Sequence, residues 1–312
     1  MIVNKIVLQI ADITCSIASA DPSVELRIER ATQSFLVPER DPDITIEARW
    51  SDLSSIKYEG PKLFDSGALW QLHRVDGVFL FSFSSEVFGT IPYKVALLKK
   101  DFSTGEVLLH HPYFHIDQLL HPLGYPLDEL LFTNFLALGS GVEVHACGVT
   151  DSQGQGHLFV GQSTAGKTTM ARLWENQPEV KVLSDDRIIL RRMGSKIWMY
   201  GTPWHGEAML ASPSRVPLTA VYFLGKGQKN ELVAQKASDS ISRLFTCSFP
   251  PFYNRDALDF TLAFLEAVVK NIPCYELKFK PDKSAVEFIK GARFTRLRQK
   301  APCGRTGRNG ER

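Results

Sequence analysis

The sequence is short of cysteine, of long apolar runs and of charge of one sign, and each shortage excludes a class of protein. The five cysteines are odd in number and form no C-x-x-C pair, which argues against a disulfide framework and a zinc site. No apolar run approaches the ~20 residues of a membrane span. The formal net charge is only +2, so nothing general favours nucleic acid as a partner. We therefore expect a protein of a reducing compartment, the cytoplasm.

The charge that is present lies unevenly along the chain. Residues 290–312 hold eight basic residues and one acid, a net charge of +7, which leaves −5 for residues 1–289. The Gly- and Arg-rich stretch 291–312 predicts a basic, disordered tail. A solvated tail is the favoured interpretation, and an arm for nucleic acid or a membrane surface is the alternative.

The composition is that of a folded protein, with 44% hydrophobic and 22% charged residues in a chain of 312. This length suggests two domains. We predict a small β-rich domain over residues 1–122. Ala18-Ser19-Ala20 resembles a signal-peptidase site, but apolar residues before it fall largely on alternate positions and favour a strand. The apolar runs that predict strands in this domain are 6–10, 24–28, 44–48 and 77–83.

Residues 123–290 change to a pattern in which helices and strands alternate. Helical spacing covers 126–138, 167–175, a segment near 241, 258–270 and 283–290. Strands are predicted at 142–149, 156–160, 180–183, 188–190, 196–200, 218–224 and 275–279. This order predicts an α/β nucleotide-binding domain.

A phosphate-binding loop is the most specific motif in the chain. Gly161 to Thr168 fits G-x-x-x-x-G-K-[ST] in full, after an apolar strand and before a helical pattern. In such a loop the backbone N–H groups and the helix N-terminus face phosphate oxygens. Lys167 would reach the β- and γ-phosphates, and the Thr168 hydroxyl would bind Mg²⁺. The residues predicted to hold the nucleotide are Gly161, Gln162, Ser163, Thr164, Ala165, Gly166, Lys167, Thr168 and Thr169.

Two adjacent acids follow the next apolar strand, 18 residues after Lys167. Asp185 and Asp186 at a strand end can take separate roles in phosphoryl transfer, one facing the metal and the other the acceptor hydroxyl. The alternative is a solvated turn in which Arg187 is a salt partner. His145 lies in the strand before the phosphate loop, where it is either structural or beside the transferred group.

These three motifs, in this order, resemble the catalytic domain of HPr serine kinase/phosphorylase, whose phosphate-loop core is shared with ATP-dependent phosphoenolpyruvate carboxykinase. The resemblance covers about residues 125–290. It implies a P-loop kinase domain of this type, with ATP and Mg²⁺ as cofactors. It further implies that Asp185 is the base toward a seryl hydroxyl, that Asp186 acts near the metal, and that His145 is the active-site histidine.

The chain departs from that family after the acidic pair. In place of the family's long signature stands the loop Gly201-Thr-Pro-Trp-His-Gly-Glu207, so the chain resembles the divergent HPr-kinase-related proteins. Loops of this composition often line sites. Glu207 is therefore a candidate further Mg²⁺ ligand and Trp204 a candidate substrate wall. The alternative is a tight turn around a buried tryptophan.

We therefore predict a kinase that moves the γ-phosphoryl group of ATP to a hydroxyl, most simply a serine of a protein or peptide, with Lys167, Asp185 and His145 as catalytic residues. Two alternatives stay open at this stage. One is a kinase of small hydroxyl metabolites, and the other is a non-catalytic module that binds ATP as a signal. The resemblance also implies a homo-oligomer.

Overall fold

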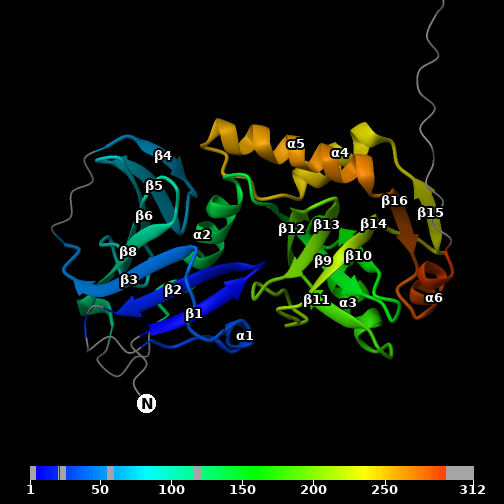
Figure 1. Ribbon diagram of the computed structural model, residues 1–312, viewed down its shortest axis with the longest axis horizontal. Coiled ribbons are helices and arrows are strands. Elements are labelled where there is room, and N and C mark those ends of the chain that lie inside the picture. The colour runs from blue at the N-terminus through cyan, green and yellow to red at the C-terminus, as the bar shows by residue number, and fades with distance from the viewer. Residues whose placement is uncertain (1–4, 20, 22–25, 55–59, 115–120, 293–312) are drawn as a thin grey trace, which may run out of the picture.

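The computed structural model describes residues 5–19, 21, 26–54, 60–114 and 121–292. Figure 1 shows two sheets side by side, with α2 between them and α5 extending along one side. The predicted tail 291–312 lies outside the described residues from residue 293 onward. Within the described residues, none of the helices combines the length and the apolarity that crossing a membrane requires.

The first sheet has eight strands in the order β1-β2-β3-β8-β7-β6-β5-β4. Its strands are β1 (Lys5–Ile10), β2 (Ile13–Ser19), β3 (Ile44–Ser51), β4 (Lys62–Asp65), β5 (Trp70–Val75), β6 (Val78–Phe83), β7 (Lys94–Leu98) and β8 (Thr104–His110). The short helix α1 (Arg30–Gln33) lies between β2 and β3, which pair in parallel. A 3-10 turn, η1 (His111–Tyr113), follows β8.

Three of the strands predicted for this region are confirmed, at β1, β3 and β6. Residues 24 and 25 of the strand predicted at 24–28 lie outside the described residues, and Leu26–Ile28 belong to none of the strands above. The sequence patterns did not predict β2, β4, β5, β7 or β8. Their short runs mix apolar and polar residues, so their apolar pattern is weak, and pairing with neighbouring strands stabilises them.

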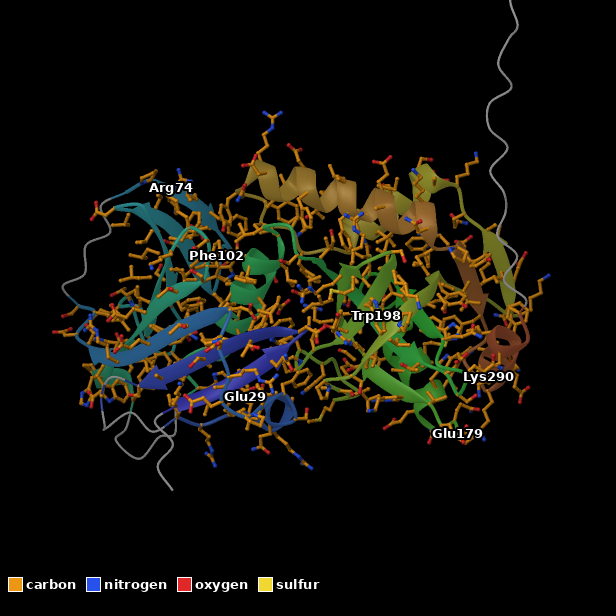
Figure 2. All side chains as sticks on the ribbon, in the orientation of Figure 1. Glu29, Arg74, Phe102, Glu179, Trp198 and Lys290 are labelled. Carbon is orange, nitrogen blue, oxygen red and sulfur yellow. The ribbon has the colours of Figure 1, made fainter. Side chains whose placement is uncertain are left out.

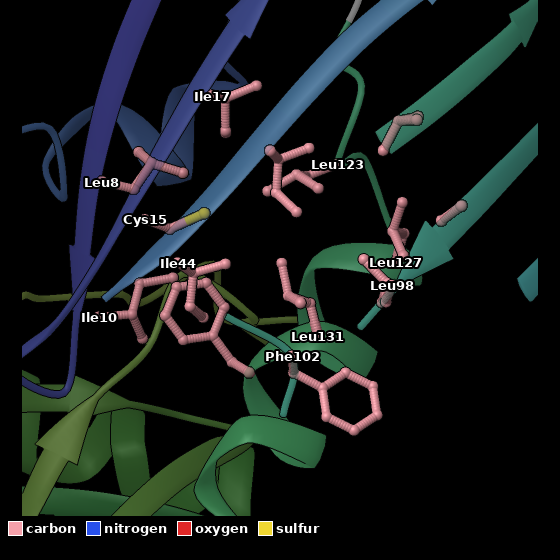
Figure 3. Packing of buried hydrophobic residues seen from close by; sticks show 14 of the residues in the cluster. Leu8, Ile10, Cys15, Ile17, Ile44, Leu98, Phe102, Leu123, Leu127 and Leu131 are labelled. Atoms are coloured by element: carbon pink, nitrogen blue, oxygen red, sulfur yellow. The ribbon is translucent and has the colours of Figure 1, made fainter. Parts of the chain in front are cut away.

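Helix α2 (Leu127–Leu136) packs against the first sheet. Its apolar residues Leu127, Leu131 and Phe132 are fully buried in the cluster that fills this half of the molecule. Figure 3 shows Leu127 and Leu131 in one cluster with Leu8, Ile10, Cys15, Ile17, Ile44, Leu98, Phe102 and Leu123. The same cluster includes Ile189, Tyr200 and Trp204 from later in the chain, so it joins the two halves.

The second sheet follows the order β10-β9-β12-β13-β14-β16-β15, and β11 pairs with β9. Its strands are β9 (Val142–Thr150), β10 (Gly156–Val160), β11 (Lys181–Ser184), β12 (Arg187–Met193), β13 (Lys196–Gly201), β14 (Arg215–Lys226), β15 (Glu231–Ala234) and β16 (Cys274–Phe279). Strand β10 also pairs in parallel with β14, which pairs in parallel with β16. All seven strands predicted here are present, and β15 was not predicted.

Helices cover both faces of the second sheet. They are α3 (Lys167–Glu175), α4 (Ala237–Thr246), α5 (Arg255–Asn271) and α6 (Ser284–Gly291), close to the predicted positions. Alternate residues of β14 face opposite ways, so Val221 and Phe223 pack with α4 and α5, whereas Tyr222 packs with α3 and α6. Figure 2 shows the side chains of both halves, with Phe102 labelled in the first and Trp198 in the second. The result is a mixed α/β structure with two large sheets.

Candidate functional site

The predicted phosphate loop joins the end of β10 to the start of α3. Gly166 is the residue before the helix and has a φ of 107°, a left-handed conformation that favours glycine. A Cβ added there would lie 2.8 Å from Cζ of Phe279, and one added to Gly161 would lie 2.5 Å from Cβ of Ala165. Both glycines of the motif are therefore required by the close approach of neighbouring atoms.

Lys167 folds its side chain back over the inside of this loop. Its Nζ donates to the carbonyl oxygens of Gly161, at 2.9 Å, and Gln162, at 3.2 Å. Burial lowers the pKa of the Lys167 ammonium, and the negative charge of Asp186 opposes this shift. Thr168 in the first turn of α3 is half-buried. The Lys167 ammonium is thus held at the loop, and Thr168 follows it in the first turn of α3.

The remaining loop residues lie nearer the surface. Gln162, Ser163 and Thr164 are exposed, Ala165 is half-buried, and Thr169 on α3 is exposed. Thr164 adopts a positive φ of 67°, which turns the chain tightly between β10 and α3. The loop and the helix that follows therefore form one continuous, accessible edge.

A hydrogen-bonded pair of titratable groups faces this loop from β9 and the start of β12. His145 Nε2 lies 2.8 Å from Asp186 Oδ1, and the two side chains are 22% and 26% exposed. The strand register sets the pair, because His145 on β9 lies directly across from Arg187 on β12. Sequence-distant residues are thus brought together with their side chains partly open to solvent.

Asp186 is held in its charged form by several neighbours. Partial burial raises the pKa of its carboxyl, but the hydrogen bond with His145 and the charges of Arg187, His145 and Lys167 outweigh burial and lower the pKa below its ordinary value. The electrostatic coupling runs from the phosphate loop, through Lys167, to the carboxylate. The Arg187 guanidinium also donates directly to Asp186 Oδ2.

Asp185 is placed differently from its neighbour. Its side chain is buried, and the residue is 1% exposed. Its carboxylate accepts backbone N–H groups of the loop after β13, from Gly206 and Ala208 at 2.9 Å and from Leu210 at 3.4 Å. The structure thus does not bring Asp185 to the surface beside Asp186, and its contacts are those of an anchor for that loop.

The two candidate site residues of the loop 201–210, Glu207 and Trp204, differ in exposure. Glu207 is exposed, between the two residues whose N–H groups bind Asp185 most closely. Trp204 is buried, its Nε1 donates to Asp128 Oδ2 at 2.7 Å, and its ring packs in the core that joins the two halves. The alternative of a buried tryptophan in a tight turn is therefore the correct one, and Trp204 as a substrate wall is wrong.

Arg187 lies at the centre of a charged cluster with Glu129 and Glu143, which the sequence patterns did not predict. Its Nε bonds to Glu129 Oε1 at 2.8 Å and lies 3.5 Å from Glu143 Oε1. Burial and the nearby Glu129 charge raise the pKa of the Glu143 carboxyl, which accepts a hydrogen bond from Thr133 Oγ1 at 2.5 Å. Glu143, an acid in a largely apolar strand, was a signal for this cluster.

A cavity of about 560 Å³ lies against the phosphate loop. It is bounded by residues 160–165, the end of β14 and helix α4. Lys226 and Arg243 line it, two cations that nothing in the sequence singles out. Strands β10, β14 and β16 are parallel, so their carboxyl ends meet at this edge, where open α/β sheets bind ligands.

The side chains here fit a magnesium ion only with help from a bound nucleotide. Among the residues that the structure describes, no group of three or more His, Cys, Asp or Glu side chains converges as a metal site. The Thr168 hydroxyl and the Asp186 carboxylate are hard oxygen donors, the kind that Mg²⁺ prefers, and Mg²⁺ usually takes its other ligands from phosphates and water. Thr168 and Asp186 have the donor chemistry that suits Mg²⁺, and Thr168, Asp186 and Glu207 stay predicted ligands.

Comparisons with known proteins place the chain far from characterised families. No protein-family model matches it, and no curated protein does. Among solved structures, the HPr(Ser) kinase/phosphatase from Coxiella burnetii is similar at 11% identity, with a TM-score of 0.27. That match covers 47% of this chain and 91% of the other. A likeness at this level carries no argument about activity.

Proposed function

We propose that the protein is an ATP- and Mg²⁺-dependent kinase that transfers the γ-phosphoryl group to a hydroxyl acceptor, a serine of a protein or peptide. One observation carries the proposal: the His145–Asp186 pair, 2.8 Å apart, is coupled electrostatically to Lys167 of a complete phosphate-loop motif. An acid–base pair beside a phosphate-binding lysine is the minimum that phosphoryl transfer needs.

The residues divide the work as follows. The loop N–H groups and Lys167 bind the β- and γ-phosphates, and Thr168 and Asp186 would hold Mg²⁺, which neutralises charge on the phosphates. The acceptor oxygen forms a bond to the γ-phosphorus as the bond to the β–γ bridging oxygen breaks, and ADP leaves. The acceptor proton passes to the Asp186–His145 pair. Asp185 holds the loop 201–210 in place through three backbone N–H groups.

A transfer assay with γ-labelled ATP tests this proposal. The purified chain is incubated with Mg²⁺ and either a serine-peptide pool or a pool of hydroxylated metabolites. Wild type should label peptides, Lys167→Ala should label nothing, and Lys100→Ala, a change of an exposed lysine in the first half, should behave as wild type. Circular dichroism confirms that the variants are folded.

Each other outcome has a definite meaning. Label only in the metabolite pool would replace the peptide acceptor with a small molecule. ATP binding without transfer to either pool would identify a non-catalytic module. Unaltered transfer by a folded Lys167→Ala protein would overturn the kinase assignment itself.

A further inference from the structure

A second cavity, of about 270 Å³, lies where the two halves meet. We call it the aromatic pocket, after the rings of Phe64, Trp70, Tyr125, Phe249, Phe252 and Tyr253 that line it. These rings come from β4, from β5, from Tyr125 two residues before α2, and from the segment that precedes α5. Figure 1 shows the start of α5 close to α2 and the first sheet. The pocket therefore depends on the packing of distant segments.

The rings of the aromatic pocket are available to a ligand. Tyr125 and Phe252 are each 59% exposed, so their rings are open to contact from outside the protein. Phe64 stacks on Trp70 with ring centroids 4.9 Å apart, which fixes one wall. Exposed rings around a concave site mark places where apolar groups bind.

The polar side chains that α2 contributes to the walls of the pocket already have partners within the protein. Asn134 Oδ1 accepts a hydrogen bond from the Tyr253 hydroxyl, and Asn134 Nδ2 donates to the Leu130 carbonyl at 2.8 Å. Thr133 Oγ1 bonds to Glu143, and Glu129 pairs with Arg187. The walls are therefore mainly apolar and aromatic, which suits an apolar group.

The aromatic pocket adjoins the acid–base pair. Arg187 lines the pocket and also donates to Asp186. Phe249 lies with its ring centroid 4.3 Å from the Arg187 guanidinium carbon and 6.1 Å from the His145 ring. The Arg187 side chain therefore separates the pocket from the acid–base pair. One or two residues of an extended peptide would span this separation.

We propose that the aromatic pocket binds a large apolar side chain, aromatic or aliphatic, of the acceptor peptide, one or two residues from the serine that is phosphorylated. This proposal rests on the proposed kinase function and adds what selects its substrate. The volume is just below the ~300–1,000 Å³ of pockets that hold whole small molecules, so it fits one side chain of a longer ligand. Anchoring that side chain positions the hydroxyl beside Asp186.

The test uses two variants that alter the pocket without touching the acid–base pair. Phe252→Ala removes an exposed ring, and Leu130→Trp places a larger side chain in the half-buried wall. Phe288→Ala is the matched control, because Phe288 is 36% exposed on α6 and is not among the residues that line the pocket. Thermal unfolding of each variant confirms that it is folded.

The substrates are four serine-peptide libraries in which each position from −3 to +3 is in turn fixed as Phe, Leu, Ala or Asp. Wild type and Phe288→Ala should prefer Phe or Leu at one position over Ala by ~10–100-fold in kcat/KM, the range that a filled apolar pocket supplies. Phe252→Ala and Leu130→Trp should lose most of that preference through a higher KM.

The outcomes separate the two proposals. Peptide phosphorylation with no preference at any position, or a preference that both pocket variants retain, would overturn the pocket assignment and leave the kinase intact. If wild type labels no peptide in any library, the peptide acceptor fails, and the pocket assignment fails with it.

Discussion

Asp185 and Asp186 are adjacent in the chain yet meet different surroundings. The Asp185 carboxylate is surrounded by backbone N–H groups of the loop 201–210, whereas Asp186 faces His145 and the charge of Lys167. A buried carboxylate that accepts several N–H groups stabilises the fold, because each buried donor left without its acceptor costs ~1–3 kcal/mol. The assignment of Asp185 as the base stays a prediction, and exchange of each acid for its amide decides it.

Asp186→Asn should abolish phosphoryl transfer while the protein remains folded, because the amide can neither take the acceptor proton nor carry the charge that His145 and Arg187 stabilise. Asp185→Asn should instead lower the free energy of unfolding by ~1–3 kcal/mol, since its NH₂ group would face N–H donors. Single-turnover transfer rates and denaturant unfolding measure the two effects. Loss of transfer by a fully stable Asp185→Asn protein would return the role of base to Asp185.

His145→Ala should slow transfer by roughly 10–10³-fold, the range for lost acid–base or electrostatic assistance. ATP affinity should stay nearly unchanged, because the imidazole bonds to Asp186 and not to the phosphate loop. The measurements are the single-turnover rate and the dissociation constant of ATP. A normal rate would make the histidine only part of its strand, and a joint loss of affinity and thermal stability would assign it to packing.

At the scale of elements, helix α5 begins immediately after the segment that builds the aromatic pocket. Its N-cap residue is Asn254, whose side chain accepts from the backbone N–H groups of Asp256 at 3.0 Å and Ala257 at 3.3 Å. Phe264, Leu265 and Val268 on the same helix bury their side chains against the second sheet. The cap therefore fixes where a helix of 17 residues starts and how residues 249–253 approach α2.

Asn254→Ala should cost about 1 kcal/mol of stability, the usual effect of losing a capping side chain. Asn254→Ser, which keeps a capping oxygen, should recover most of that loss. Denaturant unfolding of the three proteins measures the effect. Equal stability of the alanine and serine variants would show that the hydrogen bonds of the cap contribute little here.

At the scale of the whole molecule, the two halves are joined by specific polar contacts as well as by their shared core. The Tyr200 hydroxyl donates to Asp12 Oδ2 at 2.8 Å, Arg215 pairs with the same carboxylate, and Trp204 donates to Asp128. Burial raises the pKa of the Asp128 carboxyl to about 6, although the Trp204 hydrogen bond lowers it in part. Asp128 thus makes the junction sensitive to pH.

The sign of this effect follows from linkage. Because the pKa is higher in the folded state, its contribution to stability is complete below the ordinary value of 3.8 and is lost as pH rises through about 6. The loss should be about 3 kcal/mol. Asp128→Asn lacks this titration, so unfolding free energies measured from pH 4 to pH 7 should favour the variant increasingly over wild type. A constant difference across that range would contradict the prediction.

The sequence alone predicted a tight glycine loop between one strand and the next helix, and the structure has such a loop between β10 and α3, because its glycines act through local geometry. It also predicted every helix from α2 onward and all but one strand of the second sheet, because apolar residues recur in these segments at helical or strand spacing. Only tertiary structure decided which acid of the pair faces Lys167, since that depends on N–H groups of residues 206–210 that fold back onto Asp185. The aromatic pocket was equally beyond local patterns. Its walls come from residues 64–70, 125–134, 187 and 249–253, and the packing of these distant segments brings them together.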